Sequence, residues 1–179
     1  MNPRTSIGVG CSEIDDKVRT VYELTAEHRR LRESSIAQHL GPPAKGEAIR
    51  TVEQQFGVRL PEHYRCFLES HDGWQGFSGD NALLSTAQIL SGPAADWITE
   101  LKGFQSGTAL ARGHVIMGSP YSTTVVFFDP VSERDAGEMD VVYWHDGELS
   151  RYPDFGAFLD GWADLLRKNI ERERTRIRG

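Results

Sequence analysis

The chain has 179 residues, a formal net charge of −6 at pH 7, 39% hydrophobic residues and 26% charged residues. This length and composition are typical of one soluble domain with its own hydrophobic core. No apolar run approaches the roughly 20 residues that a membrane-spanning helix needs, and the N-terminal MNPRTSIGVGCSEIDD has no apolar stretch of signal-peptide length. We therefore expect a cytoplasmic protein with no membrane partner.

The chain contains two cysteines, Cys11 and Cys66, which are far apart and form no paired motif. Such a pair predicts neither a disulfide framework nor a cysteine-based zinc site. We expect Cys66 to be a small buried hydrophobic residue and Cys11 to lie in a mobile tail.

The N-terminal segment is predicted to be a disordered tail (1–11) followed by a helical extension (12–41). Ser12 and Asp15 resemble a capping box that opens a helix. The polar stretch EHRRLRE (27–33) places that helix on the surface. Gly41 and the two prolines after it are expected to end the extension.

Two short helices joined by a tight corner are predicted for IRTVEQQFGVRLPEHYRCFLESHDGW (49–74). Gly57 provides the left-handed conformation that commonly ends a helix, and Pro61 suits the first position of the next one. Asp72-Gly73 breaks the second helix. The following QGFSGDN (75–81) is interpreted as a glycine-rich loop, so Trp74 is expected to be partly exposed and able to contact a partner.

The second half of the chain predicts a sheet followed by a long helix. Ser85 or Thr86 is expected to cap a brief helix, and a second helix is predicted at 94–101. Asp146-Gly147 is a strong hairpin signal, and the short connections favour antiparallel pairing. The predicted strands are 82–84, 114–118, 123–128, 141–145 and 148–152.

A final amphipathic helix is predicted from Pro153-Asp154 through Ile170, with an apolar face that should cover one side of the sheet. The basic end of this helix (171–179) is expected to fray. The whole pattern predicts a single α+β domain. Its sheet should be mostly antiparallel, with a mixed sheet as the alternative, and flanked by helices.

Acidic residues are concentrated in one part of the sequence. Residues 129–164 contain ten acids and two arginines, a net charge of −8, whereas residues 165–179 carry +4. An acidic segment repels nucleic acid and suits a basic partner. The alternative is a solvated surface next to a basic helix end.

The search for catalytic chemistry finds none. The six histidines do not have metal-binding spacing, and no phosphate-binding loop or serine elbow is present. Asp140 and Glu148 could act as an acid–base pair in a dry cleft, but such pairs arise by chance where acids are dense. We expect a binding protein with no catalytic residues, no cofactor and no metal.

The joint pattern of the two helices and their corner resembles the SUKH superfamily, specifically its Smi/Knr-like branch. The resemblance extends over 44–166, within a predicted Smi/Knr-like domain at 42–170. The residues that carry it are Ile49, Val52, Glu53, Phe56, Gly57, Leu60, Pro61, Tyr64, Phe67, Leu68, Asp72 and Gly73, then strands around 125–128 and 141–144 and the helix 155–166.

The resemblance implies an α+β domain without catalytic residues. Bacterial members are similar in role to immunity proteins, each of which neutralises a cognate toxin, often a nuclease, whereas fungal relatives act as interaction modules in cell-wall signalling. We therefore expect a stoichiometric complex with a basic toxin, formed by a monomer or weak homodimer, and no nucleic-acid partner. The alternative is a non-catalytic regulatory module. The candidate contact residues are Asp72, Trp74, Glu133, Asp135, Glu138, Asp140, Asp146 and Glu148.

Overall fold

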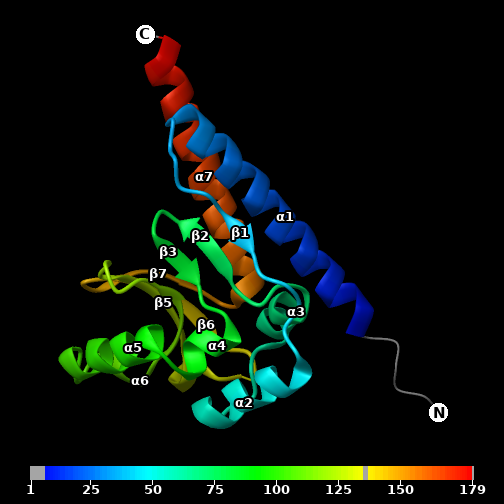
Figure 1. Cartoon of the computed structure of the whole chain (residues 1–179), viewed down its shortest axis with the longest axis vertical. Coiled ribbons are helices and arrows are strands. Elements are labelled where there is room, and N and C mark those ends of the chain that lie inside the picture. The colour runs from blue at the N-terminus through cyan, green and yellow to red at the C-terminus, as the bar shows by residue number, and fades with distance from the viewer. Residues whose placement is uncertain (1–6, 135–136, 179) are drawn as a thin grey trace.

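β-Branched and aromatic residues form an antiparallel sheet at the centre of the fold (Figure 1). The computed structural model describes residues 7–134 and 137–178. The strands pair in sequence order from β1 to β7, and every neighbouring pair is antiparallel. They are β1 (His39–Leu40), β2 (Trp74–Ser78), β3 (Asn81–Leu83), β4 (His114–Gly118), β5 (Thr124–Asp129), β6 (Asp140–His145) and β7 (Glu148–Tyr152). The single α+β domain and its antiparallel sheet are confirmed.

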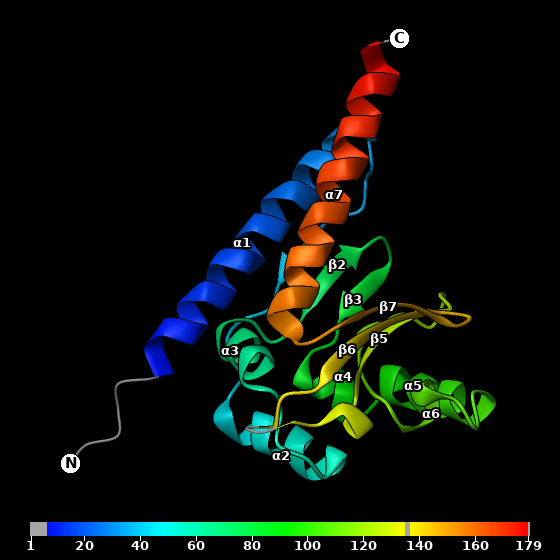
Figure 2. The same cartoon turned by 180° about the vertical axis from the view of Figure 1, so that it is seen from behind.

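Helices cover both faces of the sheet (Figures 1 and 2). They are α1 (Ile7–Leu31), α2 (Gly46–Phe56), α3 (Glu62–Ser70), α4 (Thr86–Leu90), α5 (Pro93–Phe104), α6 (Ala109–Arg112), the 3-10 helix η1 (Pro130–Ser132) and α7 (Phe155–Arg178). On one face, Tyr64 of α3 packs against Phe128 and Phe155, with ring centroids 5.2 and 5.1 Å away. On the other face, Trp97 of α5 lies so close to Gly118 that a Cβ there would collide with its ring.

Helices α1 and α7 run side by side in the same direction and extend past the sheet (Figures 1 and 2). Lys17 Nζ lies 2.5 Å from Asp160 Oδ2, and Arg174 Nη2 lies 2.6 Å from Glu27 Oε1. The disordered tail predicted for 1–11 is wrong from Ile7 onward, because α1 begins there; residues 1–6 lie outside the described part. The helix also ends at Leu31, ten positions before Gly41, and the chain then forms β1.

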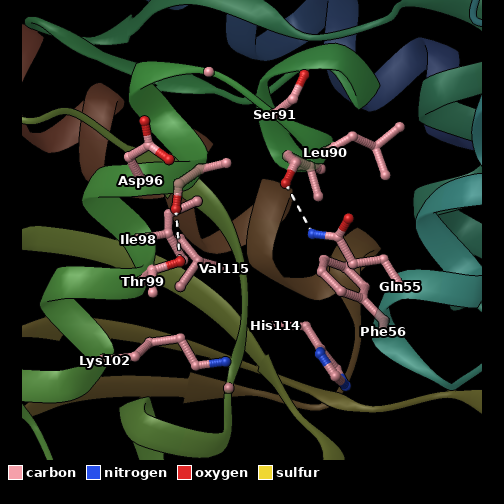
Figure 3. Close-up of a pocket in the computed structure, with 14 residues that line it drawn as sticks. Gln55, Phe56, Leu90, Ser91, Asp96, Ile98, Thr99, Lys102, His114 and Val115 are labelled. Carbon is pink, nitrogen blue, oxygen red and sulfur yellow. Dashed lines mark hydrogen bonds between the residues drawn. The ribbon is translucent and has the colours of Figure 1, made fainter.

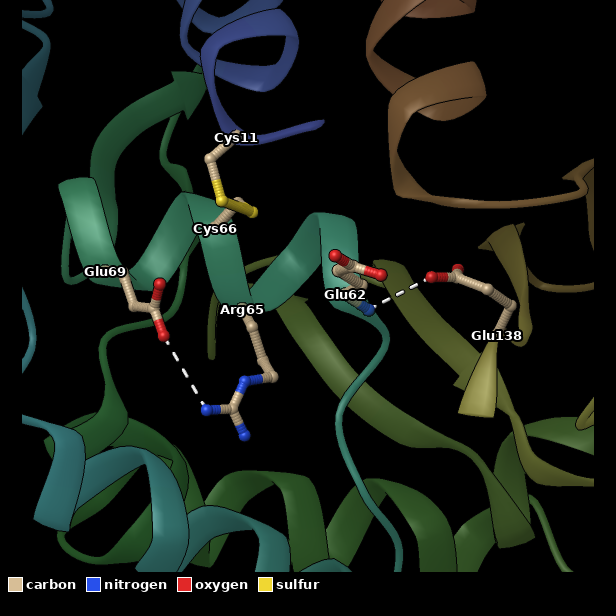
Figure 4. The surroundings of a disulfide bond; sticks show 6 residues. All are labelled: Cys11, Glu62, Arg65, Cys66, Glu69 and Glu138. Carbon is tan, nitrogen blue, oxygen red and sulfur yellow. Dashed lines mark hydrogen bonds and ion pairs between the residues drawn. A yellow bond between two sulfur atoms is a disulfide. The ribbon is translucent and has the colours of Figure 1, made fainter. Parts of the chain in front are cut away.

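The prediction of no disulfide is wrong. Cys11 of α1 is bonded to Cys66 of α3, with the Cα atoms 5.0 Å apart (Figure 4). The prediction failed because it placed Cys11 in a mobile tail, whereas α1 packs its first turns against α3. Cys66 is buried as expected, and its sulfur fastens the N-terminal helix to the domain.

Local signals in the sequence are confirmed where one residue determines the backbone. Gly57 has φ 70° and donates its N–H to the carbonyls of Glu53 and Gln54 at the end of α2. Ser85 begins α4 with a capping box that includes Gln88. The hairpin at Asp146-Gly147 joins β6 and β7, with φ 55° at Asp146.

Two local expectations are corrected. The glycine-rich stretch after Trp74 is not a plain loop, because β2 spans Trp74–Ser78 and buries Phe77. Gly76 permits this, since a Cβ there would collide with the carbonyl oxygen of Ala37. The basic C-terminal end does not fray before Arg178, because α7 continues to that residue.

Candidate functional site

An ion-pair network joins three strands at the β7 end of the sheet. Asp129 of β5 and Asp140 of β6 are direct cross-strand neighbours, an arrangement in which like charges repel. Arg151 of β7 relieves this repulsion, with Nη1 3.2 Å from Asp129 Oδ2 and 3.1 Å from Asp140 Oδ2. The complete ion-pair network consists of Arg112, Asp129, Arg134, Asp140, Glu148 and Arg151.

The outer members of the ion-pair network give each carboxylate an arginine. Arg112 Nε lies 3.1 Å from Asp129 Oδ1, and Arg134 Nη1 lies 2.5 Å from Asp140 Oδ1. Arg151 Nη2 lies 2.7 Å from Glu148 Oε2. The Asp129 side chain is only 5% exposed, so its charge needs these partners.

The network favours the ionised forms of Asp129 and Glu148. Burial acts to raise the pKa of Asp129, but hydrogen bonds from Arg112, the Val131 N–H and Arg151 together hold this pKa below its usual value. A hydrogen bond from Arg151 lowers the pKa of Glu148. Three acids of this segment, Asp129, Asp140 and Glu148, are therefore compensated by arginines in the folded chain.

The other predicted contact residues of this segment are separated. Glu133 is exposed after η1, and Asp135 lies outside the described residues. Glu138 Oε1 accepts a hydrogen bond of 3.0 Å from the N–H of Glu62, where α3 begins (Figure 4), a position that favours a carboxylate. Asp146 is exposed at the β6–β7 turn. Since Asp140 and Asp146 stand at opposite ends of β6, they are about 20 Å apart by the rise of a strand.

Asp72 and Trp74 lie at the start of β2, apart from the other predicted contact residues. Asp72 Oδ1 accepts a hydrogen bond of 2.6 Å from the Thr86 N–H, and its Oδ2 accepts one of 2.9 Å from the Thr86 hydroxyl. Asp72 therefore stabilises the first turn of α4. Trp74 is 0% exposed, so the expectation that it is partly exposed is wrong. It is buried because β2 turns its side chain into the aromatic core, against Phe77.

Of the places where the predicted contact residues lie, the outer edge of the sheet is the best candidate for a partner-binding surface. Strand β7 is the last strand in the sheet, and its Leu149 side chain is 58% exposed. Leu149, Arg134 and Arg151 were not predicted as contact residues from the sequence. A signal for Leu149 was present, because it is an apolar residue between polar residues of β7. We call this the β7-edge surface and define it as Glu133, Arg134, Asp140, Glu148, Leu149 and Arg151.

A cavity of about 650 Å³ lies elsewhere, between α2, α4, α5 and the start of β4 (Figure 3). His114 forms one wall, stacked on Phe56 with ring centroids 4.4 Å apart. Burial and the charge of Lys102 lower the pKa of His114 to about 4, so the imidazole is neutral at pH 7. Burial also lowers the pKa of Lys102.

This cavity has the size of a small-molecule site but lacks an activated nucleophile among its described lining residues. The Thr99 hydroxyl donates to the Ala95 carbonyl of its own helix, at 3.0 Å. Gln55 Nε2 donates to the Ile89 carbonyl at 3.2 Å (Figure 3). No hydrogen bond between these hydroxyl or amide groups and His114 occurs there, although nucleophilic catalysis requires a base within reach.

Neither a metal centre nor a membrane anchor is found in the part of the chain that the structure describes. Across residues 7–134 and 137–178, no three His, Cys, Asp or Glu side chains are grouped so as to hold a metal ion. No helix within these ranges has both the length and the apolar character for crossing a membrane.

The fold is that of an α+β domain whose antiparallel sheet lies between helices (Figures 1 and 2). The sequence profile of the SMI1 / KNR4 family (SUKH-1) matches residues 43–161. The chain belongs to this family, as its two-helix corner indicates. No curated protein matches the chain. Membership of the family is consistent with an immunity-protein role and with a family that is generally non-catalytic.

Proposed function

We propose that this protein is an immunity protein, an antitoxin that binds and neutralises a cognate toxin from a polymorphic or secretion-system-delivered toxin system. Family membership over residues 43–161 carries the proposal, because bacterial members of this superfamily are similar in role to immunity proteins. Inhibition by a stoichiometric complex needs no catalytic side chain, cofactor or metal.

The toxin class we propose is a nuclease with a basic surface. Nucleases bind a polyanion, and complementary charge accelerates the encounter and fixes the orientation of two partners. The net charge of −6 supports such a pairing and disfavours a nucleic-acid partner for this chain.

The contact surface we propose is the β7-edge surface. Interface centres are enriched in arginine and contain apolar anchors, and this surface offers Arg134, Arg151 and the exposed Leu149. An edge strand also presents backbone N–H and C=O groups that a partner strand can pair with. Asp146 lies at the far end of β6 and extends the surface toward the hairpin turn.

Two modes of inhibition are compatible with this surface. Glu133 and Glu148 can occupy positions where a toxin binds substrate phosphates, which blocks the active site directly. The β7-edge surface can instead bind an exosite. The association rate measured with and without saturating substrate separates them, because substrate slows formation of the complex only when the chain binds at the active site.

The test is rescue of growth by the chain when the product of the adjacent open reading frame is expressed. We expect rescue together with co-purification of the two proteins. A variant with Leu149→Asp and Glu133→Lys should lose both, whereas Glu23→Lys on the exposed side of α1 should retain both. Growth arrest in the presence of abundant folded wild-type chain would count against the proposal.

The second candidate is a non-catalytic regulatory module of the same fold. The ion-pair network favours it, because compensated carboxylates steer a basic partner less strongly than free ones. A toxin gene beside this one supports immunity, and an endogenous, non-toxic partner on the β7-edge surface supports regulation.

We propose further that the chain acts in the cytoplasm, where an immunity protein meets its toxin, as a monomer or weak homodimer. Cytoplasmic thiols are normally kept reduced, so the working form would carry free thiols at Cys11 and Cys66. Light scattering at micromolar concentration tests the oligomeric state, and thiol labelling of protein from lysate tests the redox state.

A further inference from the structure

A second cleft lies where α1, α7 and the β2–β3 turn meet. Two cavities of about 540 and 310 Å³ adjoin there and share His28, Arg29, Arg32 and Gly79 as lining residues. The two helices that frame this cleft are the pair that extends past the sheet (Figures 1 and 2). Most of the cleft comes from parts of the chain outside residues 43–161, so it is an addition to the family domain.

Two residues that line the deeper cavity each carry a buried polar atom that has no hydrogen-bond partner in the described structure. These atoms are the hydroxyl oxygen of Thr25, a residue 3% exposed, and the indole Nε1 of Trp162, a residue 6% exposed. Leaving one buried polar group unpaired costs about 1–3 kcal/mol. Two such groups on residues that line the same cavity point to hydrogen bonds with something other than the chain, and the Trp162 indole can only donate.

The cationic groups at the mouth of the cleft are poorly compensated. Arg29 donates to the carbonyl oxygens of Ile36, at 3.1 Å, and Gly76, and no carboxylate pairs with it among the described residues. Arg32 Nε lies 3.7 Å from Glu173, a carboxylate that is also 2.7 Å from Arg176. A part-buried guanidinium that contacts only carbonyl oxygens favours an added anion.

The pKa of His28, which also lines the cleft, responds to the same positive charges. Burial and the charges of Arg32 and Arg29 lower the pKa of His28, while Glu173 acts in the opposite direction. Glu27, another acid near this part of α1, is paired with Arg174 at 2.6 Å, and Glu33 lines the outer cavity beside Arg29 and Arg32. The cleft therefore combines positive charge at its mouth with unpaired polar groups in its depth.

We propose that this cleft binds a small oxyanion, the carboxylate or phosphate group of a ligand. Arg29 and Arg32 supply charge in the fork geometry that suits either group. The Trp162 N–H and the Thr25 hydroxyl donate hydrogen bonds from the cavity wall. The apolar neighbours Phe77 and Leu165 contact the remainder of the ligand.

The first test uses the full chain with sodium phosphate or sodium acetate, at an ionic strength held constant with sodium chloride. We expect a saturable rise in Tm with at least one of the two anions. The anion that binds more tightly identifies the class of the natural ligand, a phosphate compound or a carboxylate. A response to both anions that is no larger than that to chloride overturns the proposal.

Thr25→Val separates a ligand site from a packing defect. It keeps the shape of the side chain and removes the unpaired hydroxyl, so the variant should have a higher Tm in chloride and bind the anion about fivefold more weakly, as the loss of one hydrogen bond implies. Thr20→Val on the same helix is the matched control; the Thr20 hydroxyl donates to the Asp16 carbonyl at 2.9 Å. The control should leave anion affinity unchanged.

Arg32→Gln and Arg30→Gln each remove one positive charge from the end of α1, but only Arg32 lines the cleft. We expect the anion affinity to fall about tenfold in Arg32→Gln, as loss of a charge-assisted hydrogen bond implies, and less than twofold in Arg30→Gln. Anion binding should also raise the pKa of the His28 imidazole in NMR titrations. Equal weakening by the two arginine variants, or an unshifted His28 at saturating anion, overturns the assignment.

Discussion

Arg151 of β7 reaches diagonally to Asp140 of β6, two positions from its direct cross-strand neighbour Val142, with Nη1 3.1 Å from Oδ2. The same nitrogen lies 3.2 Å from Asp129, so one arginine holds two acids that the strand register places opposite each other. Part of the acidic segment therefore fastens the end of the sheet. Variants of these paired acids therefore test folding, whereas variants of exposed acids such as Glu133 test binding.

Asp140→Asn should lower the free energy of unfolding by about 1–2 kcal/mol, because it leaves Arg134 and Arg151 without one of their acceptors. Asp146→Asn should change it by less than about 0.5 kcal/mol, because this side chain is 72% exposed. Urea unfolding curves of the two variants measure the difference. Equal stabilities would show that the network contributes nothing to folding.

Glu133→Lys should weaken toxin binding about tenfold, mainly through a slower association rate, because charge at the rim of an interface steers the encounter. Glu23→Lys on α1 is the control with the same change of net charge. Surface plasmon resonance at two salt concentrations provides both rates. The same slowing in both variants would assign the effect to overall charge and would remove Glu133 from the contact surface.

Asp129→Asn should destabilise the chain by about 3 kcal/mol at pH 7, because it removes one partner of a buried, doubly paired charge. In the wild type, the pKa of Asp129 lies below its ordinary 3.8 in the folded state. Its contribution is therefore present above pH 3.8 and is lost as the pH falls through the lowered folded value.

The variant should accordingly lose part of the acid dependence of stability below about pH 4, which unfolding curves between pH 2 and 5 measure. Asp164→Asn, which breaks an exposed pair with Arg167, should leave this dependence intact. A variant with the wild-type acid profile would show that the folded and unfolded states bind protons alike at this site.

The disulfide should stabilise the oxidised chain. Cys11 and Cys66 are 55 positions apart, and closing a loop of this length removes unfolded-state entropy worth about 4 kcal/mol. Dithiothreitol should lower the Tm of the wild type toward that of the Cys11→Ala/Cys66→Ala variant and leave the variant unchanged. In the reduced chain, Ile14, Val18 and Val21 keep α1 packed, so its central amides should stay protected from hydrogen exchange. A wild type insensitive to dithiothreitol would mean that the bond does not form in solution.

His114 should make the chain less stable at pH 5 than at pH 7. Its pKa is about 4 in the folded state, against an ordinary value of 6.5. The unfolded state therefore binds more protons between these values, and stability rises with pH across that window. After allowance for solvent screening, the difference should be about 1 kcal/mol. The His114→Gln variant should show a smaller difference between the urea midpoints measured at the two pH values; an unchanged difference would exclude His114 as its source.

Much of the fold could be predicted because single residues determine local geometry. Gly57 ends α2 in the left-handed conformation, Ser85 caps α4, and Asp146-Gly147 forms the hairpin. Strand β2 was missed because Gly76, together with Gly79 just after the strand, resembles a loop; the burial of Trp74 and Phe77 holds β2 in the sheet. That burial comes from tertiary packing and leaves no local signal.

The candidate site was less predictable, because charge compensation depends on distant residues. Arg112 lies 17 positions from Asp129, and Arg151 lies 22 positions from it. Counting acids along the sequence therefore overestimated the free negative charge. The disulfide was missed for the same reason, since only the packing of α1 on α3 brings Cys11 to Cys66.

The most direct test of the immunity proposal is a titration of the purified toxin, the product of the adjacent gene, with this protein while toxin activity is measured. We predict a linear fall in activity that reaches zero at an equimolar amount of the chain, as a tight stoichiometric complex requires. The β7-edge variant with Leu149→Asp and Glu133→Lys should need a large excess. Full toxin activity in the presence of a severalfold excess of folded wild-type protein would contradict the proposal.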